Sequence, residues 1–565
     1  RGGPSPSDGD LGVSPRYSFV PLSLPKGEGD RGGEGFRDSL YRGRLQPVPC
    51  RRGERHRITL RASGFMFDCK AVCWFPGELG PWHDVGGSWG KGEEAVKVLL
   101  VNPRLREWSP NVWVPLGLTY VAAALEAHGH EIRIVDFNVD KFNENEFKGA
   151  VAEAQIVGIT GLITEFDKVL NLARKAREAN AATKIVLGGP LATSFCREML
   201  ELSQADCAVL GEGEATIIEL LSAIEHDGSL SGVQGIAYRE NGNVVINGAR
   251  PSIAALDSLP FPARHLLDMK RYVRDHFRSF GLRIEGAGKI RSTNLITSRG
   301  CPYSCVYCYK EMWGYKWRAR SPQNVVREME LLLETYGVNG FIFCDDIFVL
   351  NRKRVMEFCR ELKEKDLGVI WYCNGRANLM TPELLKAMYE AGCRGIAYGI
   401  ESGSQRILDL TTKGITLEQV RNVVRWTREA GIKATGYFML GMLGETKETI
   451  ADTIAFAKEL GLDYYGFSIT TPLPGTKLYS MALEKGRIQG DMTALKDWGF
   501  HANANLTEDC SDEELEGFAR EAFREFTLKR MGKYSLAREA AKVVLSLQNM
   551  KEAGAFLSKA YRLFR

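Results

Sequence analysis

Short apolar runs alternate with amphipathic, helix-forming stretches along most of the chain, and this alternation limits the possible folds more than any other feature. The first five runs lie at residues 96–101, 131–135, 155–160, 184–187 and 206–210. Continuous apolar runs are typical of strands buried on both faces of a parallel sheet. Helix-period stretches such as residues 117–127 and 165–179 separate them. Residues 95–230 are therefore predicted to form a doubly wound, flavodoxin-like parallel-sheet domain.

In a sheet of this kind, ligands bind beyond the carboxyl ends of the strands. The loops at those ends are residues 102–104, 160–162, 188–190 and 211–214. Three of the four contain glycine, which lets the backbone approach a ligand closely. Many nucleotide-binding and signalling domains share this arrangement, so the loops alone predict a ligand edge without naming the ligand.

The two ends of the chain differ from this pattern. Residues 1–92 hold 18 Gly and 9 Pro and show no lasting periodicity, so we expect a disordered or non-native extension. Residues 231–292 form a connector, in which Asn241-Gly242 between two apolar runs predicts a hairpin. Helical periodicity returns at residues 512–530, 535–547 and 552–564, which predicts a small helical domain over residues 485–565.

Composition excludes several classes of protein. A formal net charge of +4 in 565 residues gives no reason to expect nucleic acid as a partner. No run of 18 apolar residues exists, so no conventional membrane span is predicted. The 13 cysteines are odd in number and scattered, which favours reduced thiols or a metal site in a reducing cytoplasm over a disulfide scaffold.

Three of those cysteines, Cys301, Cys305 and Cys308, lie within eight residues, just after a strand-like run. Three thiolates at this spacing can hold three irons of a 4Fe-4S cluster and leave the fourth iron open to a substrate or cosubstrate. A structural zinc site would need a fourth Cys or His nearby, and no His lies between Cys308 and His501.

This CxxxCxxC motif, with the aromatic Tyr307 before its third cysteine, resembles the cluster loop of the radical S-adenosylmethionine (SAM) superfamily. Six further strand candidates, each followed by a helical pattern, lie at residues 294–298, 340–344, 369–373, 395–400, 433–440 and 464–470. The resemblance implies a partial (β/α)6 barrel over residues 293–484, with its active site at the carboxyl ends of the strands.

Polar residues stand at those strand ends, and the resemblance implies that they bind SAM. Asp345 or Asp346 would meet the amino group of the methionine moiety, and Arg376 would pair with its carboxylate. Glu401 and Ser402 would hold the ribose. The other predicted SAM contacts are Tyr307, Asn374 and Glu445.

The first domain resembles the cobalamin-binding domain that precedes many such barrels. The motifs that carry this resemblance are residues 115–118, 160–162, 188–190 and 211–214. The predicted cobalamin contacts are Leu116, Gly117, Thr160, Gly161, Leu162, Gly188, Gly189, Glu212 and Gly213. Residues 102–108, where such domains often carry an axial histidine, contain none. His128 and His130, before the second strand, are interpreted as turn or surface residues.

Together these resemblances imply a cobalamin-dependent radical SAM enzyme, a C-methyltransferase with a 4Fe-4S cluster, SAM and cobalamin. A 5′-deoxyadenosyl radical would activate an unreactive carbon of a small or lipid-like metabolite for methylation or for oxidative ring formation. Reduced flavodoxin or ferredoxin would supply the electron. Two alternatives are a methylthiotransferase acting on RNA or protein and a non-catalytic carrier. The first would need three cysteines in the leading domain, where residues 95–230 contain only Cys196 and Cys207.

Overall fold

The computed structural model of the protein describes residues 56–62, 65–71, 95–104, 112–226, 228–280, 282–286, 288–488 and 505–528. The chain divides into two compact units between Glu78 and Leu79. In the first unit, β1 (His56–Ala62) and β2 (Phe65–Ala71) pair in an antiparallel hairpin. This hairpin lies in the extension that was expected to be disordered or non-native, because two strands of seven residues are too short to establish a periodicity among so many glycines and prolines.

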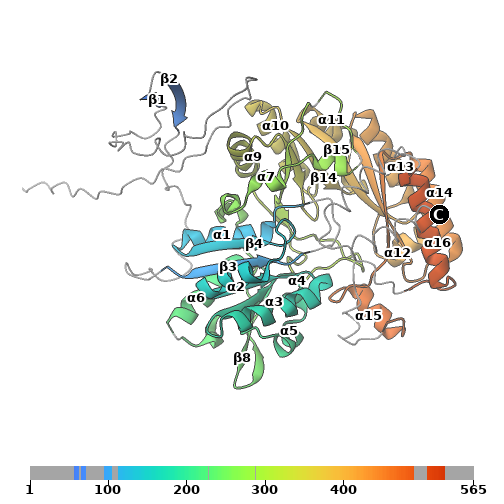
Figure 1. The fold of residues 1–565 in the computed structure, drawn as a ribbon. Coiled ribbons are helices and arrows are strands. Elements are labelled where there is room, and N and C mark those ends of the chain that lie inside the picture. Colours follow the sequence, from blue (N-terminus) through green and yellow to red (C-terminus); the bar gives the residue numbers. More distant parts are fainter. Residues whose placement is uncertain are drawn as a thin grey trace, which may run out of the picture. The chain divides into compact units, whose positions relative to one another are not determined.

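The second unit begins with a seven-stranded sheet, ordered β4-β3-β5-β6-β7-β8-β9 (Figure 1). Its strands are β3 (Lys97–Asn102), β4 (Glu131–Asp136), β5 (Ile156–Thr160), β6 (Lys184–Gly188), β7 (Cys207–Val209), β8 (Ile236–Glu240) and β9 (Asn243–Ile246). The first five are parallel, and their order is the flavodoxin-like 2-1-3-4-5. The predicted hairpin, β8 and β9, continues this sheet antiparallel to β7, so the sheet extends to Ile246.

Helices cover both faces of this sheet. They are α1 (Leu116–Ala127), α2 (Glu144–Glu153), η1 (Ile163–Glu165), α3 (Phe166–Ala179), α4 (Gly189–Ser194), α5 (Cys196–Leu202), α6 (Gly213–Glu225) and η2 (Leu230–Gly232). Along β3, Leu99 and Val101 join one buried cluster while Val98 and Leu100 join another. Both faces of the strand are therefore buried, which is why its sequence is apolar without alternation.

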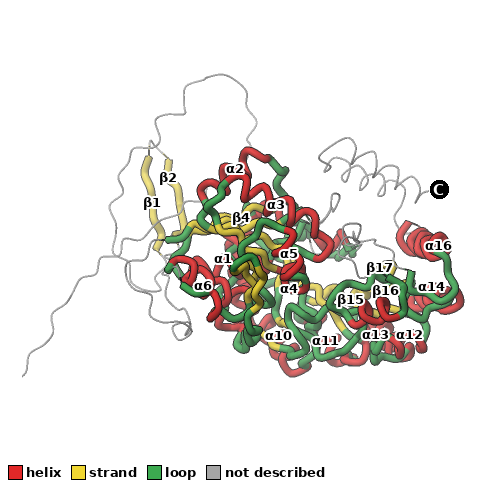
Figure 2. Tube along the Cα trace, turned by 90° about the horizontal axis from the view of Figure 1, so that it is seen from below, coloured by secondary structure: helices red, strands yellow, loops and turns green. Residues whose placement is uncertain are grey.

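A second parallel sheet of six strands follows, in the simple order β10-β13-β14-β15-β16-β17. Its strands are β10 (Ser292–Leu295), β13 (Gly340–Phe343), β14 (Ile370–Gly375), β15 (Cys393–Glu401), β16 (Lys433–Leu440) and β17 (Tyr464–Ile469). The helices between them are α9 (Pro322–Tyr336), α10 (Arg352–Lys365), η5 (Ala377–Leu379), α11 (Pro382–Glu390), α12 (Gln405–Leu410), α13 (Leu417–Glu429) and α14 (Lys447–Leu460). Figure 2 shows these helices outside the curved sheet. The fold class predicted from the sequence is confirmed.

The barrel has a different filling on each face of its sheet. On the outer face, the ring of Phe358 packs edge to face on Phe343 and Trp371, which are tilted against each other, with ring centroids 5.5–5.6 Å apart. On the inner face, connector residues fill the space near the start of the strands. The connector contains η3 (Leu256–Ser258), η4 (Arg264–Leu266), α7 (Met269–Tyr272) and α8 (His276–Ser279). The residues on the inner face are those from α8 onward. Phe277 and Leu282 join Ile342 and Tyr372 there.

The described part of the C-terminal segment packs on the barrel. It consists of α16 (Asp512–Phe523) and the π-helical turn η7 (Arg524–Leu528), and it follows α15 (Lys477–Glu484), the last helix within the range predicted for the barrel. Leu515 and Phe526 belong to the outer barrel core, and the Phe526 ring lies 4.5 Å from that of Tyr465 on β17. The helices predicted at residues 535–547 and 552–564 lie outside the described residues.

Candidate active site at the carboxyl ends of two sheets

The three clustered cysteines lie on a loop that is closed at its base. A short antiparallel ribbon, β11 (Ser298–Arg299) with β12 (Arg318–Ala319), joins the two ends of the loop. Gly300 follows the ribbon with φ +83°, and a Cβ there would lie 2.4 Å from the Lys316 carbonyl oxygen. Only glycine allows so close an approach. We call residues 300–317 the cluster loop.

The cysteine side chains have the donor chemistry that an iron–sulfur cluster needs. Cys305 is buried, and Cys301 and Cys308 are half-buried. A hydrogen bond from the Cys308 thiol, with the nearby Lys413 and Arg376 charges, lowers the pKa of the Cys305 thiol to about 5, whereas the same bond and burial raise the pKa of Cys308. Cationic surroundings favour thiolates, the form that binds iron. Among the described residues no three His, Cys, Asp or Glu side chains already converge as a metal site.

Next to the cysteines, four side chains form a charged group that we call the Arg376 group: Tyr303, Arg376, Glu401 and Lys413. The Arg376 guanidinium lies 3.6 Å from the centre of the Tyr303 ring and donates to the Lys413 carbonyl. Lys413 Nζ donates to Glu401 Oε1 at 2.7 Å, and both side chains are about nine-tenths buried. Arg376 Nε is buried and has no hydrogen-bond partner among the described residues, which leaves a donor for a bound anion.

Glu401 itself has an unusual backbone conformation. Its φ is +69°, in the left-handed region, and the pairing of β15 with β16 shifts by one residue between Gly399 and Glu401. Non-glycine residues in this region cost about 1–3 kcal/mol and occur where the surroundings hold them. The bulge turns the Glu401 carboxylate toward Lys413. Lys413 and Tyr303 were missed in the sequence, because neither belongs to a recognisable motif.

Three of the predicted SAM contacts have side chains that bind other parts of the barrel. Asp345 accepts from the Thr297 N–H at 2.7 Å and from the Thr297 and Ser298 hydroxyls. The Ser402 hydroxyl lies 3.1 Å from that of Thr453 on α14. Glu445 Oε2 accepts from two backbone N–H groups at 2.7 and 2.9 Å, and burial raises its pKa to about 7.

The remaining three lie nearer to the cysteines or to open space. The Asp346 side chain is accessible to solvent, but many protein atoms surround its carboxyl. The partial loss of water raises the pKa of this carboxyl. Asn374 Nδ2 donates to the Asp345 carbonyl at 3.1 Å. Burial, the Glu401 carboxylate and the Cys305 and Cys308 thiols raise the pKa of the Tyr307 hydroxyl.

The predicted cobalamin contacts lie along one edge of the first sheet. Thr160 ends β5 and Gly188 ends β6, next to the point where the strand order reverses between β3 and β5. Gly189 has φ +82°, and a Cβ there would lie 2.6 Å from Thr160 Oγ1 and 3.0 Å from the Gly161 carbonyl oxygen. This edge is therefore built of closely packed main chain, the kind of cradle that a large flat cofactor needs.

The other predicted contacts are at helix starts. Leu116 and Gly117 are the first two residues of α1, the former buried and the latter with no atom within 4 Å of a built Cβ. Leu162 is 38% exposed beside Gly161. Gly213 begins α6, and the Glu212 carboxylate before it is taken up by Arg299 and Arg318.

The cluster loop is in direct contact with the edge of the first sheet that holds the predicted cobalamin contacts. We call residues 160–162 and 188–194, which lie at this edge, the cobalamin edge. The Tyr309 hydroxyl lies 2.8 Å from Ser194 Oγ and donates to the Pro190 carbonyl at 3.2 Å. Thr193 Oγ1 lies 3.4 Å from Met312 Sδ. Residues that follow β6 therefore touch the loop that carries the cysteines, which brings the two predicted cofactor sites side by side.

His128 and His130 lie at the other edge of the first sheet. His128 caps the end of α1, where Nδ1 lies 2.8 Å from the Ala124 carbonyl oxygen, and His130 immediately precedes β4. Both lie near the amino end of β4. His128 is a half-buried turn residue, whereas His130 is buried and is not the surface residue that the sequence suggested. No described helix is both long and apolar enough to cross a bilayer.

Comparison with known proteins agrees with this arrangement. Residues 107–221 match the family described as B12 binding domain, and residues 295–457 match the radical SAM superfamily. An uncharacterised methyltransferase of Pyrococcus horikoshii is 35% identical over 399 residues, covering 69% of this chain and 84% of that protein. The anaerobic magnesium-protoporphyrin IX monomethyl ester cyclase of Rubrivivax gelatinosus is 29% identical, covering 68% and 69%.

A solved structure shows the same fold. The cobalamin-dependent SAM radical enzyme OxsB, with aqua-cobalamin and SAM bound, superposes with a TM-score of 0.63 at 18% identity and covers 83% of this chain and 71% of its own. The cofactors of this chain are a 4Fe-4S cluster, SAM and cobalamin, and an electron donor is required. The methylthiotransferase alternative is not favoured, because the leading domain matches the B12-binding family. The chain is an enzyme that belongs to the cobalamin-dependent radical SAM family of methyltransferases and cyclases.

Proposed function

We propose that the enzyme methylates an unactivated carbon of a small or lipid-like metabolite. The observation that carries this proposal is the contact of Tyr309 and Met312, on the cluster loop, with residues 190–194 at the cobalamin edge. When bound, the cofactors supply a radical derived from SAM and a transferable methyl group. The protein must hold both beside one substrate carbon and keep water away.

Each part of the site has a role in this proposal. Cys301, Cys305 and Cys308 hold three irons. Arg376, with its unpartnered buried Nε, binds the carboxylate of the methionine moiety of SAM. Asn374 or Asp346 meets the amino group.

Near the ribose, Glu401 is held in place by Lys413. Asp345, Ser402 and Glu445 shape the strand ends through their hydrogen bonds to the barrel. The residues at the ends of β5 and β6 hold the cobalamin.

An apolar part of the substrate is supported by the inner face of the barrel. Tyr437 alternates along β16 with Phe438, which is buried in the outer core, so Tyr437 points inward, where it is 36% exposed. A Cβ on Gly466 would lie 2.5 Å from the Tyr437 ring, so the absence of a side chain at Gly466 makes room for that ring. The exposed ring gives an aliphatic or aromatic group a surface to pack on.

Oxidative ring formation is the second candidate, favoured by the similarity to the Rubrivivax cyclase. We further propose reduced flavodoxin or ferredoxin as electron donor and the cytoplasm as location. A reducing compartment is consistent with the cysteines, since every one whose side chain is described is a free thiol.

The test uses the full chain, prepared without oxygen and loaded with cluster and cobalamin. A loaded enzyme should hold about four irons and one cobalt. It is then incubated with SAM carrying a deuterated methyl group, a reductant, and fractionated small-molecule and lipid extracts. A compound that gains the labelled methyl supports methylation. A compound that loses two hydrogens without label supports ring formation. Label recovered only in RNA or protein would contradict both.

A further inference from the structure

The ribbon that closes the cluster loop contains an electrostatic conflict. Arg299 on β11 and Arg318 on β12 are direct partners in the antiparallel register. Each is only 5% exposed. Like charges directly opposite one another destabilise a strand pair, and burial removes the water that would screen them. The ribbon therefore needs counter-charges from elsewhere.

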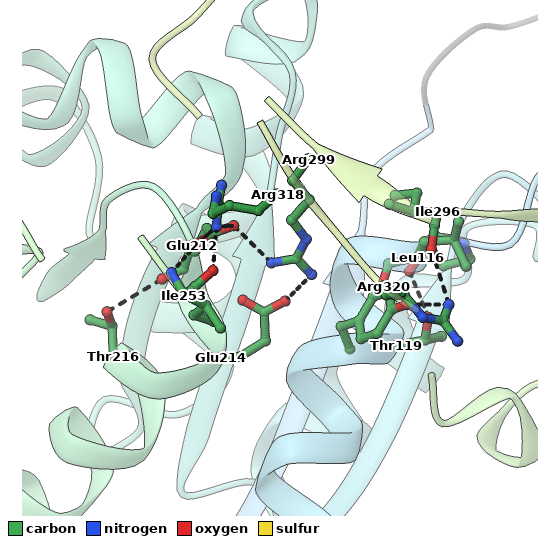
Figure 3. Close-up of polar contacts among 12 residues, drawn as sticks. Leu116, Thr119, Glu212, Glu214, Thr216, Ile253, Ile296, Arg299, Arg318 and Arg320 are labelled. Atoms are coloured by element: carbon green, nitrogen blue, oxygen red, sulfur yellow. Dashed lines mark hydrogen bonds and ion pairs between the residues drawn. The ribbon is translucent and has the colours of Figure 1, made fainter. Parts of the chain in front are cut away.

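Those counter-charges come from the cobalamin-binding domain (Figure 3). Glu212 bridges the two arginines, since its Oε1 lies 3.0 Å from Arg299 Nη1 and 2.9 Å from Arg318 Nη1, with Oε2 at 2.8 Å from the latter. Glu214 Oε1 accepts from Arg299 Nη2 at 2.5 Å. Glu212 and Glu214 are also buried, so two positive and two negative groups neutralise one another inside the protein.

The main chain around these groups makes the arrangement rigid. The Ile253 N–H donates to Glu212 Oε2 at 2.7 Å, and Arg318 Nη1 donates to the Ile253 carbonyl at 2.7 Å. Arg299 is separated from Cys301 only by Gly300. The Gly300 backbone packs closely against the Lys316 carbonyl and has little room to move independently of Arg299. A shift of the Arg299 backbone would therefore move the first cysteine.

We propose that Glu212 and Glu214 are positioning residues that fix the cluster loop against the cobalamin edge, so that the loop closes in its active form only when the two domains are docked. They act through Arg299 and Arg318, which gives Glu212 a different role from the cobalamin contact predicted from the sequence. The proposal rests on the proposed function, because it assumes that both cofactors work on one substrate. It adds that the spacing between their sites is set by this ion-pair group.

A second buried group provides a matched control. Glu328 on α9 also binds two arginines, Arg264 and Arg320, and all three are at most 4% exposed. Its arginines do not face each other in a ribbon, and neither is paired with Glu212 or Glu214. Glu328→Gln removes the same kind of buried charge as Glu212→Gln, next to the ribbon because Arg320 directly follows β12, but it leaves both arginines of the ribbon paired with Glu212.

The first experiment is hydrogen–deuterium exchange on the full chain without cofactors. Glu212→Gln should speed exchange in residues 300–317 by about tenfold or more, because two buried arginines lose their shared partner. Glu328→Gln should leave that segment at the wild-type rate. Equal rates in wild type and Glu212→Gln would overturn the proposal. Should Glu212→Gln fail to fold, Glu214→Gln, which keeps the Glu212 bridge, should show a smaller increase in the same segment, and its absence would overturn the proposal.

The second experiment uses the loaded enzyme and a spectroscopic readout. With cobalt as Co(II) and the cluster reduced, electron paramagnetic resonance reports the magnetic interaction between the two centres, which depends on their distance. We expect a weaker or more scattered interaction in Glu212→Gln at unchanged iron and cobalt content, and a wild-type interaction in Glu328→Gln. An unchanged interaction in Glu212→Gln would contradict the proposal. A wild-type protein that holds no cobalt would refute the proposed function instead, and the exchange experiment would still decide on the loop.

Discussion

The two parallel sheets present their carboxyl edges in different ways. The first sheet offers main chain at residues 160–162 and 188–189, where Gly189 packs against Thr160 with no room for a Cβ. The barrel offers the charged side chains of the Arg376 group, buried beside the cysteines. The edges meet where Tyr309 contacts Ser194.

This difference follows from what each edge binds. SAM is small and carries a carboxylate and an amino group, so placed charges and hydrogen bonds recognise it. Cobalamin is large, and a surface of close-packed backbone can follow its shape. Substitutions should therefore act by charge and geometry at the barrel edge, and by volume at the first sheet.

The largest loss of activity is expected from substitution of a cluster cysteine. Cys305→Ala should abolish the cluster, because two thiolates cannot hold it, and SAM cleavage should fall to background. The measurements are iron content and 5′-deoxyadenosine formation. Cys359→Ala, a buried thiol on α10 outside the site, is the control and should keep its iron. Full iron content in Cys305→Ala would show that the cluster is held elsewhere.

Volume at the first sheet is tested by two glycines. Gly189→Ala puts a methyl group 2.6 Å from Thr160 Oγ1 at a φ of +82°, which should cost about 1–3 kcal/mol and lower cobalt content severalfold. Gly149→Ala, in the helix α2 with open space around it and outside the predicted cobalamin contacts, should be stabilising by about 0.5–1 kcal/mol and keep cobalt. Cobalt per chain and denaturant midpoints separate the two. Equal cobalt content in both variants would show that the main chain at residues 160–162 and 188–189 is not part of the cobalamin site.

Sequence reasoning was strongest where a function depends on local spacing. The CxxxCxxC motif and the alternation of strands and helices are local patterns, and both predicted the fold that the structure shows. Arg376 and Glu401 could be assigned to one edge because they stand at the carboxyl ends of strands of the same parallel sheet.

What the sequence could not show are contacts between distant segments. Asp345 looks like a ligand at a strand end, but Thr297 and Ser298, 47–48 residues earlier, occupy its oxygens. Glu212 stands in a glycine-rich loop typical of cofactor binding, yet its partner Arg318 is 106 residues away. Such pairings depend on how distant segments pack, within the barrel for Asp345 and between the two domains for Glu212, and no local pattern encodes them.

Charge geometry at the barrel edge is tested by Arg376→Lys. Lysine keeps the positive charge but loses the planar stack on Tyr303 and the Nε–H donor, so SAM affinity should fall about ten- to hundredfold. Equilibrium binding of SAM to the cluster-loaded protein measures this. Arg394→Lys, whose guanidinium lies 4.5 Å from the Tyr389 ring outside the site, should bind SAM normally. Normal affinity in Arg376→Lys would show that its charge alone matters.

The smallest expected effect concerns Glu165, a buried carboxyl beside the cobalamin edge. Burial, with some repulsion from Asp136, raises its pKa to about 7 despite hydrogen bonding to the Leu162 N–H and the charge of Lys168. The folded state therefore keeps this proton up to a higher pH than the unfolded state, so stability falls as pH rises from about 4.5 to 7, and the full cost remains above that range. Glu165→Gln keeps a side-chain acceptor for Leu162 and removes the titration.

Between pH 6 and pH 8 the stability of Glu165→Gln relative to wild type should therefore rise by about 1 kcal/mol. Urea unfolding of the cofactor-free chain at both pH values measures the difference. The exposed Glu390, whose pKa is lowered by its hydrogen bond from the Lys363 ammonium, provides the control, since Glu390→Gln should give the same difference from wild type at both pH values. A Glu165→Gln curve that also runs parallel to wild type would mean that this carboxyl is ionised in the folded state throughout. The first sheet would then hold a buried negative charge at its ligand edge. The edges of the two sheets would both carry charged side chains and would differ less than proposed here.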